Sequence, residues 1–535
     1  MTMVRQGPGP EAYNEPGQGR TIRAVGHSFR MGCDMKIALD RGFIIERFPA
    51  LEPVTERCAD FWGRSKTFLL CITLIYSIGI SAIVRADFLY LDDLGRTLYG
   101  YRGWENFSRF SSNILSGILN GGRLLSDISP LTQLLAAVIM GLAASILAYT
   151  FSDGGETKTG ALFAVIPLAL NPYFLECFSY KFDSPFMAVS VLASVLPFLV
   201  YDLKPFLTVS ILSLLLMFTT YQVSSGIYVM VAMFLAFRLF FDRRDLVEIR
   251  AFVARSVAAY ASAALIYRFL IMRPTDDYVS SASYPLGSMC AGILANYRNF
   301  YSLVLSDFRR LWLALLAVTA IAFLVAVACR TERKILPSVA LAAALLAVSS
   351  VAAIGLYVVL EKPLLAPRAM YPIGALLALV NLFIFGAGKP LPIGKLTCSY
   401  LSVCFFVFAF TYGNALAQQW DYTAFRMQCA VDDLQDVPSM STDNTKTIQV
   451  AGSIGMSPVV ERVSGTYGVL GRLVPATFDG SGWIWTTYYF YYYLKLPNIQ
   501  VDQNVDLREM DLPMLSDGPY QTIYGDDTHV LIVLK

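Results

Sequence analysis

The sequence predicts an α-helical polytopic membrane protein with a small α/β domain at its C-terminal end. The 535 residues have a mean hydropathy of +0.53 and only 15% of them are charged, against about 25% in ordinary globular domains. The apolar residues form blocks close to the length of about 20 residues that crosses a bilayer. After the last block, from Gln418 onward, the chain becomes polar and acidic.

About eleven apolar blocks are candidate membrane spans, and nine to eleven crossings are expected from a span length of about 20 residues. The blocks cover residues 67–84, 131–151, 160–173, 185–201, 206–221, 224–241, 251–271, 311–329, 336–360, 370–387 and 396–415. The short blocks 206–221 and 224–241 could be two spans, or one span and a re-entrant segment. The first block begins only at Thr67, so we expect a retained span and not a cleaved signal peptide.

The pattern predicts three regions. They are a partly disordered tail over residues 1–66, a membrane domain over 67–415 with a first outer loop at 85–130, and a C-terminal domain over 416–535. The short loops on one side contain Arg243, Arg244, Arg250, Arg330, Arg333, Lys334, Lys389 and Lys395. The positive-inside rule makes that side cytoplasmic, together with the N-terminus, and places the first loop and the C-terminal domain outside.

The C-terminal domain contains strand-like pieces, such as "TIQVAGSI" and "HVLIVLK", which predict a small α/β or mainly β fold. Its segment "WIWTTYYFYYYLK" (Trp483 to Lys495) is too polar for a further span. The segment fits an aromatic belt at the membrane surface or a core strand. It also fits a platform on which a sugar ring stacks, and the sequence leaves these interpretations open.

Zinc and nucleotide chemistry are not expected. The nine cysteines form no CxxC pair and the two histidines are His27 and His529. Cys177, Cys290 and Cys429 fall on the outer side, and a disulfide between two of them stays open. No Walker motif and no glycine-rich dinucleotide signature appears, so ATP or a nucleotide sugar on the cytoplasmic side is not supported.

The first outer loop begins with "DFLYLDDLGRTLYGYRGWENFSRF", which places two adjacent carboxylates and three arginines directly after a span. Asp92 and Asp93 precede Arg96 by i,i+4 and i,i+3 spacing, which puts the three side chains on one helix face. An aspartate held this way stays ionised at neutral pH and can take a proton from a hydroxyl nucleophile. A simple helix salt bridge is the alternative.

Other polar and aromatic residues on the outer side are candidates for contacts with a phosphate or a sugar. The glycine pair Gly121 and Gly122 lets the backbone approach a ligand, and the arginine after it can bind a phosphate through two hydrogen bonds. The candidates are Trp104, Arg123, Glu176, Lys181, Asp183, Tyr221, Gln222 and Arg368. For Arg368, snorkelling to the membrane interface is the alternative.

This combination fits an enzyme with a lipid-phosphate sugar donor. The leaving phosphate needs cations, the acceptor hydroxyl needs a base, and a polyprenyl tail needs a groove between spans. Transporters place ionisable residues near the midplane of broken helices, whereas the mid-span segments here are almost free of charge. A lipid-linked-sugar flippase and a non-catalytic assembly factor stay open as alternatives.

Five pieces occur in order along the membrane domain: "DDLGRTLYGYRGW", "NGGRLLSDISPLTQ", "NPYFLECFSYKFDSPFMA", "TTYQ" and "APRAM". Together they resemble the membrane glucosyltransferases that modify bacterial O-antigen, the serotype-converting type II family. The resemblance implies a membrane-embedded glycosyltransferase fold of class C. It also implies inverting transfer of glucose from undecaprenyl phosphate-glucose to lipopolysaccharide O-antigen on the periplasmic face. The alternative is another polyprenyl-linked sugar or another cell-envelope acceptor.

The resemblance also gives the candidate residues their roles. Asp93 would be the base, with Asp92 as the second acid, although the residues do not rank them, and Arg96 would orient the pair. Phosphate contacts would come from Arg123, Lys181 and Arg368, sugar contacts from Asp183 and Trp104, and further substrate contacts from Tyr221 and Gln222. No cofactor is required. Two adjacent carboxylates without histidine would favour Mg²⁺ or Mn²⁺ over Zn²⁺ if a metal binds.

The implied location is the bacterial inner membrane, with a cytoplasmic N-terminus and a periplasmic C-terminal domain. The expected partners are the lipid-linked donor, the O-antigen acceptor and the bilayer, with no nucleic acid. The acceptor sugar, the linkage and the oligomeric state do not follow from the sequence.

Overall fold

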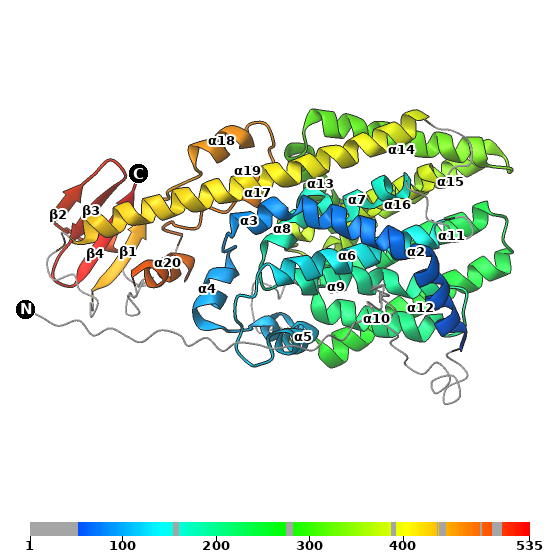
Figure 1. Cartoon of the computed structure of the whole chain (residues 1–535), viewed down its shortest axis with the longest axis horizontal. Coiled ribbons are helices and arrows are strands. Elements are labelled where there is room, and N and C mark those ends of the chain that lie inside the picture. The colour runs from blue at the N-terminus through cyan, green and yellow to red at the C-terminus, as the bar shows by residue number, and fades with distance from the viewer. Residues whose placement is uncertain are drawn as a thin grey trace, which may run out of the picture. The chain divides into compact units, whose positions relative to one another are not determined.

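The computed structural model describes residues 52–152, 160–273, 282–386, 392–435, 437, 446–481, 484–494 and 506–535. The disorder expected in the N-terminal tail falls before residue 52, outside the described residues. Residues Pro53–Lys535 pack as one compact unit, which contains a helical bundle and a small sheet (Figure 1).

The helices of the bundle follow one another along the chain, with short 3-10 or π segments between some of them. In chain order they are α2 (Glu52–Gly79), α3 (Ser81–Ala86), α4 (Asp92–Tyr99), η2 (Trp104–Phe107), α5 (Phe110–Asn120), α6 (Leu131–Thr150), α7 (Gly160–Leu170), α8 (Pro172–Ser179), α9 (Ser184–Val195), η4 (Leu196–Val200), α10 (Phe206–Thr220), η5 (Gln222–Ser224), α11 (Ser225–Phe241), α12 (Leu246–Ile266), η6 (Tyr267–Ile271), α13 (Met289–Asp307), α14 (Arg310–Arg330), α15 (Ile335–Ala352), η7 (Gly355–Val359), η8 (Pro367–Ala369), α16 (Pro372–Phe385) and α17 (Pro392–Gln435).

Each of the predicted apolar blocks coincides with a helix or a helix pair. Among the described residues, seven helical segments are long and apolar enough to cross a membrane: Glu52–Ala86, Leu131–Thr150, Gln222–Phe241, Leu246–Ile271, Arg310–Arg330, Ile335–Ala352 and Pro392–Gln435. The pair α7 and α8 would add one more span, and α9 with η4, α10 and α16 are shorter apolar segments. The chain is therefore a membrane protein, whereas the number of crossings and their orientation stay predictions.

The pair α7 and α8 is bent by 59°, and the sequence "NP" at its centre explains the bend. Pro172 disfavours a helical conformation for the residue before it, and Asn171 has extended angles. The Asn171 side chain accepts hydrogen bonds from the N–H groups of Tyr173 and Phe174, so it caps a new helix. Helix α8, which carries Glu176, therefore runs in a different direction from α7.

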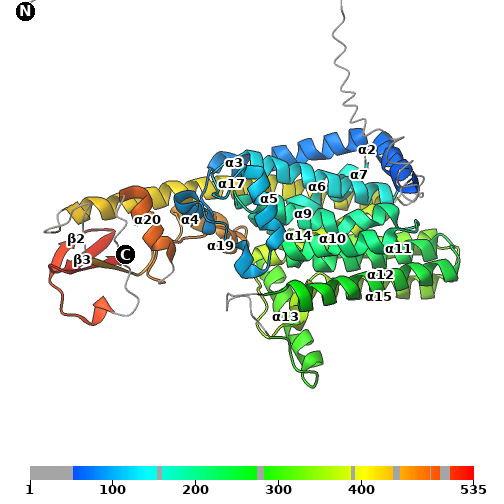
Figure 2. The same ribbon diagram turned by 90° about the horizontal axis from the view of Figure 1, so that it is seen from below.

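Helix α17 joins the bundle to the C-terminal sheet. Its 44 residues extend over about 66 Å at 1.5 Å per residue, well beyond a hydrocarbon core of about 30 Å. The predicted domain boundary at 415/416 falls inside this helix, so no break in the chain marks it. Figures 1 and 2 show α17 alongside the bundle, with its far end beside the sheet. Gly413 allows the close crossing of α17 and α3, because a Cβ there would lie 2.4 Å from the Ala82 carbonyl carbon.

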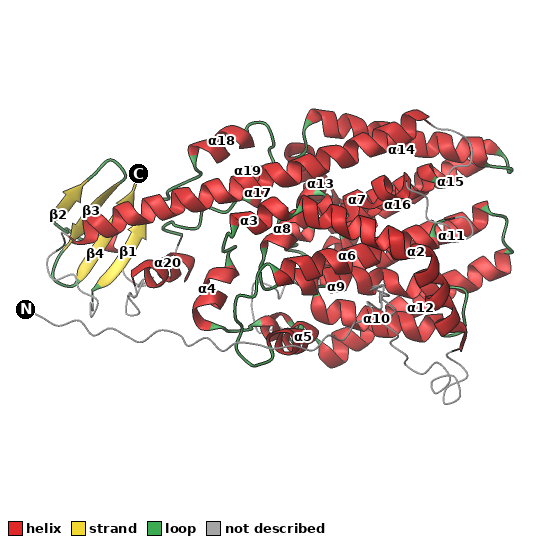
Figure 3. Cartoon of the chain, viewed as in Figure 1, coloured by secondary structure: helices red, strands yellow, loops and turns green. Residues whose placement is uncertain are grey.

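The C-terminal part contains both helices and strands (Figure 3). Its elements are β1 (Thr447–Ala451), α18 (Pro458–Ser464), α19 (Leu470–Leu473), α20 (Ile484–Leu494), η9 (Leu507–Glu509), β2 (Met514–Asp517), β3 (Gln521–Gly525) and β4 (His529–Leu534). The strand order is β1-β4-β3-β2, with β1 parallel to β4 and the other pairs antiparallel. The sheet packs on the end of α17 through Met427, Ala430 and Leu434.

The structure decides one expectation about the aromatic segment and one about the outer cysteines. The core-strand interpretation of the aromatic segment is wrong, because its described residues form helix α20. Tyrosine-rich segments are typical of strands, but here tertiary packing determines the conformation. Cys177, Cys290 and Cys429, which were open to a disulfide, are all free thiols.

Candidate active site

Helix α4 fixes the two adjacent aspartates at its N-terminal end. Asp92 and Asp93 occupy the first turn, where the positive end of the helix dipole favours carboxylates. Gly100 ends the helix with a φ of 66° and donates its N–H to the Arg96 carbonyl, which is a usual role of glycine at a helix C-terminus. Asp92 is half-buried, whereas Asp93 is fully buried. The two neighbours in sequence therefore meet different surroundings.

Asp93 is held by the backbone of two segments. Its Oδ2 accepts hydrogen bonds from the N–H of Lys181 at 2.8 Å and of Tyr90 at 3.3 Å. Its Oδ1 is buried with no hydrogen-bond partner in the described part of the chain. Burial and the nearby Asp183 carboxylate raise the pKa of Asp93 well above its usual range. The expectation that this carboxylate is held ionised therefore does not fit its position.

Arg96 forms its ion pair outside its own helix. The expected pairing with Asp92 or Asp93 is replaced by a buried pair with Asp183, the residue before α9. The indole N–H of Trp104 donates to the same carboxylate, and the Arg96 guanidinium lies 4.6 Å from the indole ring centroid. Trp104 is only 1% exposed, so its ring faces are covered by protein and not open to a sugar. These three side chains join α4, the first loop and α9.

Lys181 links three acidic segments. Its ammonium group contacts Asp87 at 2.5 Å and Asp127 at 2.9 Å, and its backbone N–H binds Asp93. The side chain is buried, while Asp87 is 77% exposed. Because the ammonium already has two carboxylate partners, Lys181 fits a structural role better than a contact with a donor phosphate.

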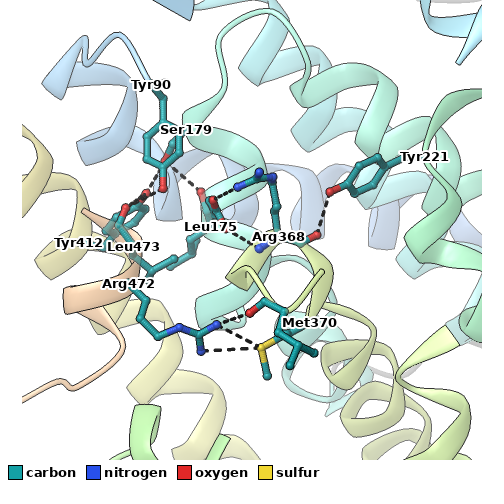
Figure 4. Close-up of polar contacts among 11 residues, drawn as sticks. Tyr90, Leu175, Ser179, Tyr221, Arg368, Met370, Tyr412, Arg472 and Leu473 are labelled. Atoms are coloured by element: carbon teal, nitrogen blue, oxygen red, sulfur yellow. Dashed lines mark hydrogen bonds and ion pairs between the residues drawn. The ribbon is translucent and has the colours of Figure 1, made fainter. Parts of the chain in front are cut away.

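A second group of charges lies around Glu176 and Arg368 (Figure 4). The buried Glu176 carboxylate accepts a hydrogen bond from the Arg368 guanidinium at 2.9 Å and another from the Arg368 backbone N–H. The Arg368 side chain is 20% exposed, and its guanidinium lies 5.7 Å from the Tyr180 ring centroid. Glu176 thus orients a partly accessible cation.

Tyr221 and Gln222 lie between Arg368 and a second arginine. The Tyr221 hydroxyl donates to the Arg368 carbonyl at 3.2 Å. The Arg109 guanidinium lies 4.5 Å from the Tyr221 ring centroid, and its Nε–H donates to the Gln222 side chain at 3.4 Å. Gln222 in turn donates to the Tyr267 hydroxyl at 2.8 Å. The structure therefore brings Tyr221, Gln222 and Arg368 together, with Arg109 as an additional member.

The C-terminal part reaches back to the same end of the bundle. Arg472, in α19, forms an ion pair with Asp307 at 2.5 Å. The next residue, Leu473, accepts hydrogen bonds at its carbonyl from the hydroxyls of Tyr90 at 2.8 Å and Tyr412 at 3.3 Å. Figure 4 shows the contacts of Tyr90 and Tyr412 with Leu473 close to Arg368, and Arg472 beside the Met370 sulfur. The C-terminal domain is thus tied to the loop that precedes α4.

Arg123 is not brought to either group. It is exposed after α5 and has no polar partner among the residues that the structure describes. In the same part of the chain, no three His, Cys, Asp or Glu side chains are placed to hold one metal ion. Whether transfer needs Mg²⁺ or Mn²⁺ at Asp92 and Asp93 stays a prediction.

Residues 81–379 match the family described as glucosyl transferase GtrII. The chain belongs to this family. A curated relative from Salmonella phage P22, described as an uncharacterized 55.3 kDa protein in the gtrB 5' region, is 34% identical over 139 residues. That match covers 26% of this chain and 28% of the relative. No solved structure matches the chain.

The GtrII match begins in α3 and ends in α16. It contains the acidic turn of α4 and the pair of Glu176 and Arg368, but neither α17 nor the C-terminal domain. Two site residues escaped the sequence analysis. Arg109 lies in the same arginine-rich loop as Arg96. It was not chosen as a candidate, because it lies too far along the chain from Asp92 and Asp93 to share a helix face with them. Arg472 lies in a segment with no recognisable motif, so nothing in the sequence pointed to it.

Proposed function

We propose that this GtrII-family glycosyltransferase moves glucose from undecaprenyl phosphate-glucose to lipopolysaccharide O-antigen, on the periplasmic face of the bacterial inner membrane. The observation that carries the proposal is the family match across the acidic loop, Glu176 and Arg368. The phage relative, which comes from the gtrB 5' region, supports a role in surface-glycan modification. The positively charged short loops support the orientation.

We assign the base to Asp92 in preference to Asp93. A general base must come within about 2.6–3.2 Å of the hydroxyl that it deprotonates, and only the half-buried Asp92 is accessible. The acceptor oxygen attacks the anomeric carbon as the bond from that carbon to the phosphate oxygen breaks. The hydroxyl proton passes to Asp92, and the bonding electrons leave with the polyprenyl phosphate. Attack opposite the leaving group inverts the anomeric centre.

The cations Arg109 and Arg368 are the proposed phosphate contacts. They lie on either side of Tyr221, and a guanidinium binds phosphate oxygens through paired hydrogen bonds. Glu176 holds Arg368 in place. Charge that develops on the leaving phosphate is stabilised by donors that are already oriented.

An apolar cavity provides a place for the polyprenyl tail. Its volume is about 600 Å³, and it is lined by α11, α12 and α15. Tyr260, at its wall, packs on Phe218, which stacks on Tyr267 at 5.1 Å. The Tyr267 hydroxyl accepts from Gln222, the partner of Arg109. Packed side chains therefore connect the wall of the cavity with the proposed phosphate contacts, and the proposal places the tail and the phosphate of one amphipathic donor at these two sites.

The test is transfer from radiolabelled undecaprenyl phosphate-glucose to purified lipopolysaccharide by wild-type protein in detergent. We expect label in the polymer, and its loss with Asp92→Asn while donor binding persists. A repeat in EDTA measures the metal requirement. Donor that is bound but never transferred by the wild type would contradict the proposal and favour another sugar or acceptor. Donor translocation in vesicles, unchanged by Asp92→Asn, would favour a flippase.

A further inference from the structure

Helix α20 packs on the helix that carries the two aspartates. A Cβ at Gly95, in the middle of α4, would lie 2.4 Å from Cε2 of Tyr488 and 2.8 Å from the Tyr101 hydroxyl. Such close approaches are not tolerated by packed side chains, so glycine at this position permits the contact. The C-terminal domain thereby places one of its tyrosines against α4.

The contact extends into a continuous group of rings. Tyr99 stacks on Tyr491 with a centroid distance of 5.6 Å and an interplanar angle of 10°, and it lies 5.5 Å from Tyr488. Tyr99 is 48% and Tyr101 is 37% exposed, and the two tyrosines of α20 are half-buried. We call Tyr99, Tyr101, Tyr488 and Tyr491 the tyrosine patch. Each member therefore keeps part of its surface accessible to solvent.

The patch adjoins the proposed base. Burial and the nearby Asp92 carboxylate raise the pKa of Tyr101. Burial and the Tyr99 hydroxyl raise the pKa of Tyr488, to which Asp92 also contributes. The geometry agrees, because Asp92 and Gly95 share a face of α4 by i,i+3 spacing and Tyr488 lies against Gly95. Rings that bind at the patch are therefore within reach of Asp92.

The position of α20 argues against a membrane belt. Its Tyr489 and Phe490 are buried with Phe478, in the core that also holds the sheet strands. Tyr488 and Tyr491 share another face of the helix by i,i+3 spacing and point to α4. Figures 1 and 2 both show α20 and α4 between the sheet and the bundle. One face of α20 is therefore buried in the core of the C-terminal domain, and another face is partly exposed next to α4.

We propose that the tyrosine patch is the binding subsite for the acceptor glycan, an inference that rests on the proposed function. A tyrosine offers an apolar face for the C–H face of a pyranose ring and a hydroxyl for its polar edge. Binding there delivers an acceptor hydroxyl to Asp92. The donor contacts at Arg109 and Arg368 lie within the part of the chain that matches GtrII, whereas α20 lies outside it. The C-terminal domain thus contributes Tyr488 and Tyr491 to the subsite, and with them a part in the choice of acceptor.

The experiment compares Tyr491→Ala, Tyr99→Ala and Tyr491→Phe with wild type, measuring acceptor and donor KM separately. We expect the alanine variants to raise the acceptor KM about three- to tenfold, since an aromatic contact contributes about 0.5–1.5 kcal/mol. Donor KM and the slow hydrolysis of donor by water should not change. Tyr491→Phe, which keeps the ring, should lose less. Tyr520→Ala is the control, because Tyr520 is 38% exposed in the same domain and packs on Phe425 instead.

The outcomes separate this inference from the proposed function. A wild type that transfers no glucose contradicts the proposed function itself. A wild type that transfers glucose, with an unchanged acceptor KM in both alanine variants, overturns the subsite alone. The inference would also be overturned if the donor KM rose as much as the acceptor KM in Tyr491→Ala or Tyr99→Ala. Such a result would mean that the substitution disturbs the whole active site. Weaker retention in lipid with unchanged acceptor KM would identify a membrane belt and overturn it as well.

Discussion

The carboxylate group around α4 and the arginine group around Tyr221 divide the site between two kinds of surroundings. The first contains Asp87, Asp92, Asp93, Asp127 and Asp183 with the cations Arg96 and Lys181. The second contains Arg109 and Arg368 with the single carboxylate Glu176. The first group thus has an excess of negative charge and the second an excess of positive charge. This separation suits a reaction that removes a proton at one end and releases a phosphate at the other.

Within the acidic group, most carboxylates already have a hydrogen-bond or ion-pair partner. Asp183 is taken by Arg96 and Trp104, and Asp87 and Asp127 by Lys181. Asp93 is buried against backbone N–H groups, which leaves Asp92 as the accessible acid without a cation partner among the described residues. Adjacent positions in a sequence can therefore differ completely in role. The assignment of the base to Asp92 depends on this difference between Asp92 and Asp93.

The largest expected effect is the loss of turnover in Asp92→Asn. Asparagine keeps the shape but cannot accept the proton, and general-base catalysis contributes about 10²–10⁴-fold. We expect kcat to fall by that factor with donor KM nearly unchanged, measured by transfer of labelled glucose. The matched variant Asp93→Asn should retain most of its turnover. If Asp93→Asn loses turnover and Asp92→Asn does not, the two roles are reversed.

The next effect concerns the attachment of the C-terminal domain. Arg472→Ala leaves the buried Asp307 carboxylate without its cation, and breaking a fully buried pair costs about 3–5 kcal/mol. The cost here is smaller, because Arg472 is 25% exposed. We expect a lower thermal midpoint and faster proteolysis after α17. Arg508→Ala, which removes an exposed ion pair, is the control. An equal effect of both variants would show that the Arg472 contact is no anchor.

A smaller effect is expected at the arginine group. Arg109→Ala removes a half-buried cation that has no carboxylate partner in the described residues, so stability should hardly change. Donor KM should rise about tenfold, the effect of losing about 1.4 kcal/mol of phosphate contact. Steady-state kinetics with the labelled donor measure this. Arg123→Ala is the control, and a similar rise there would mean that Arg123 also binds the phosphate.

The sequence predicted the helices well because each apolar block is a local pattern of composition. It also named Asp92 and Arg368 as candidates from signals that lie within a few residues, but it preferred Asp93 as the base and did not predict the bend at "NP". It could not predict that Arg96 pairs with Asp183, because that contact joins segments far apart in the chain. For the same reason the aromatic segment was open to a strand, although α20 is a helix that packs on α4. Roles inside a site depend on burial, which local spacing does not reveal.

The smallest effect on turnover is expected for the buried member of the acidic pair, Asp93, which is tested by the pH dependence of its stability. The folded-state pKa of Asp93 is raised, so its ionisation opposes folding. Wild-type stability should fall as the pH rises from the unfolded pKa, about 3.9, towards the folded value, by about 1.4 kcal/mol for each unit of elevation. The amide that Asp93→Asn introduces stays neutral, so the thermal midpoint of this variant relative to wild type should improve as the pH rises above the unfolded pKa of about 3.9. A relative midpoint that instead declines over this range would mean that Asp93 is stabilised as a carboxylate. Asp93 would then compete with Asp92 for the role of base, and the contrast within α4 would not hold.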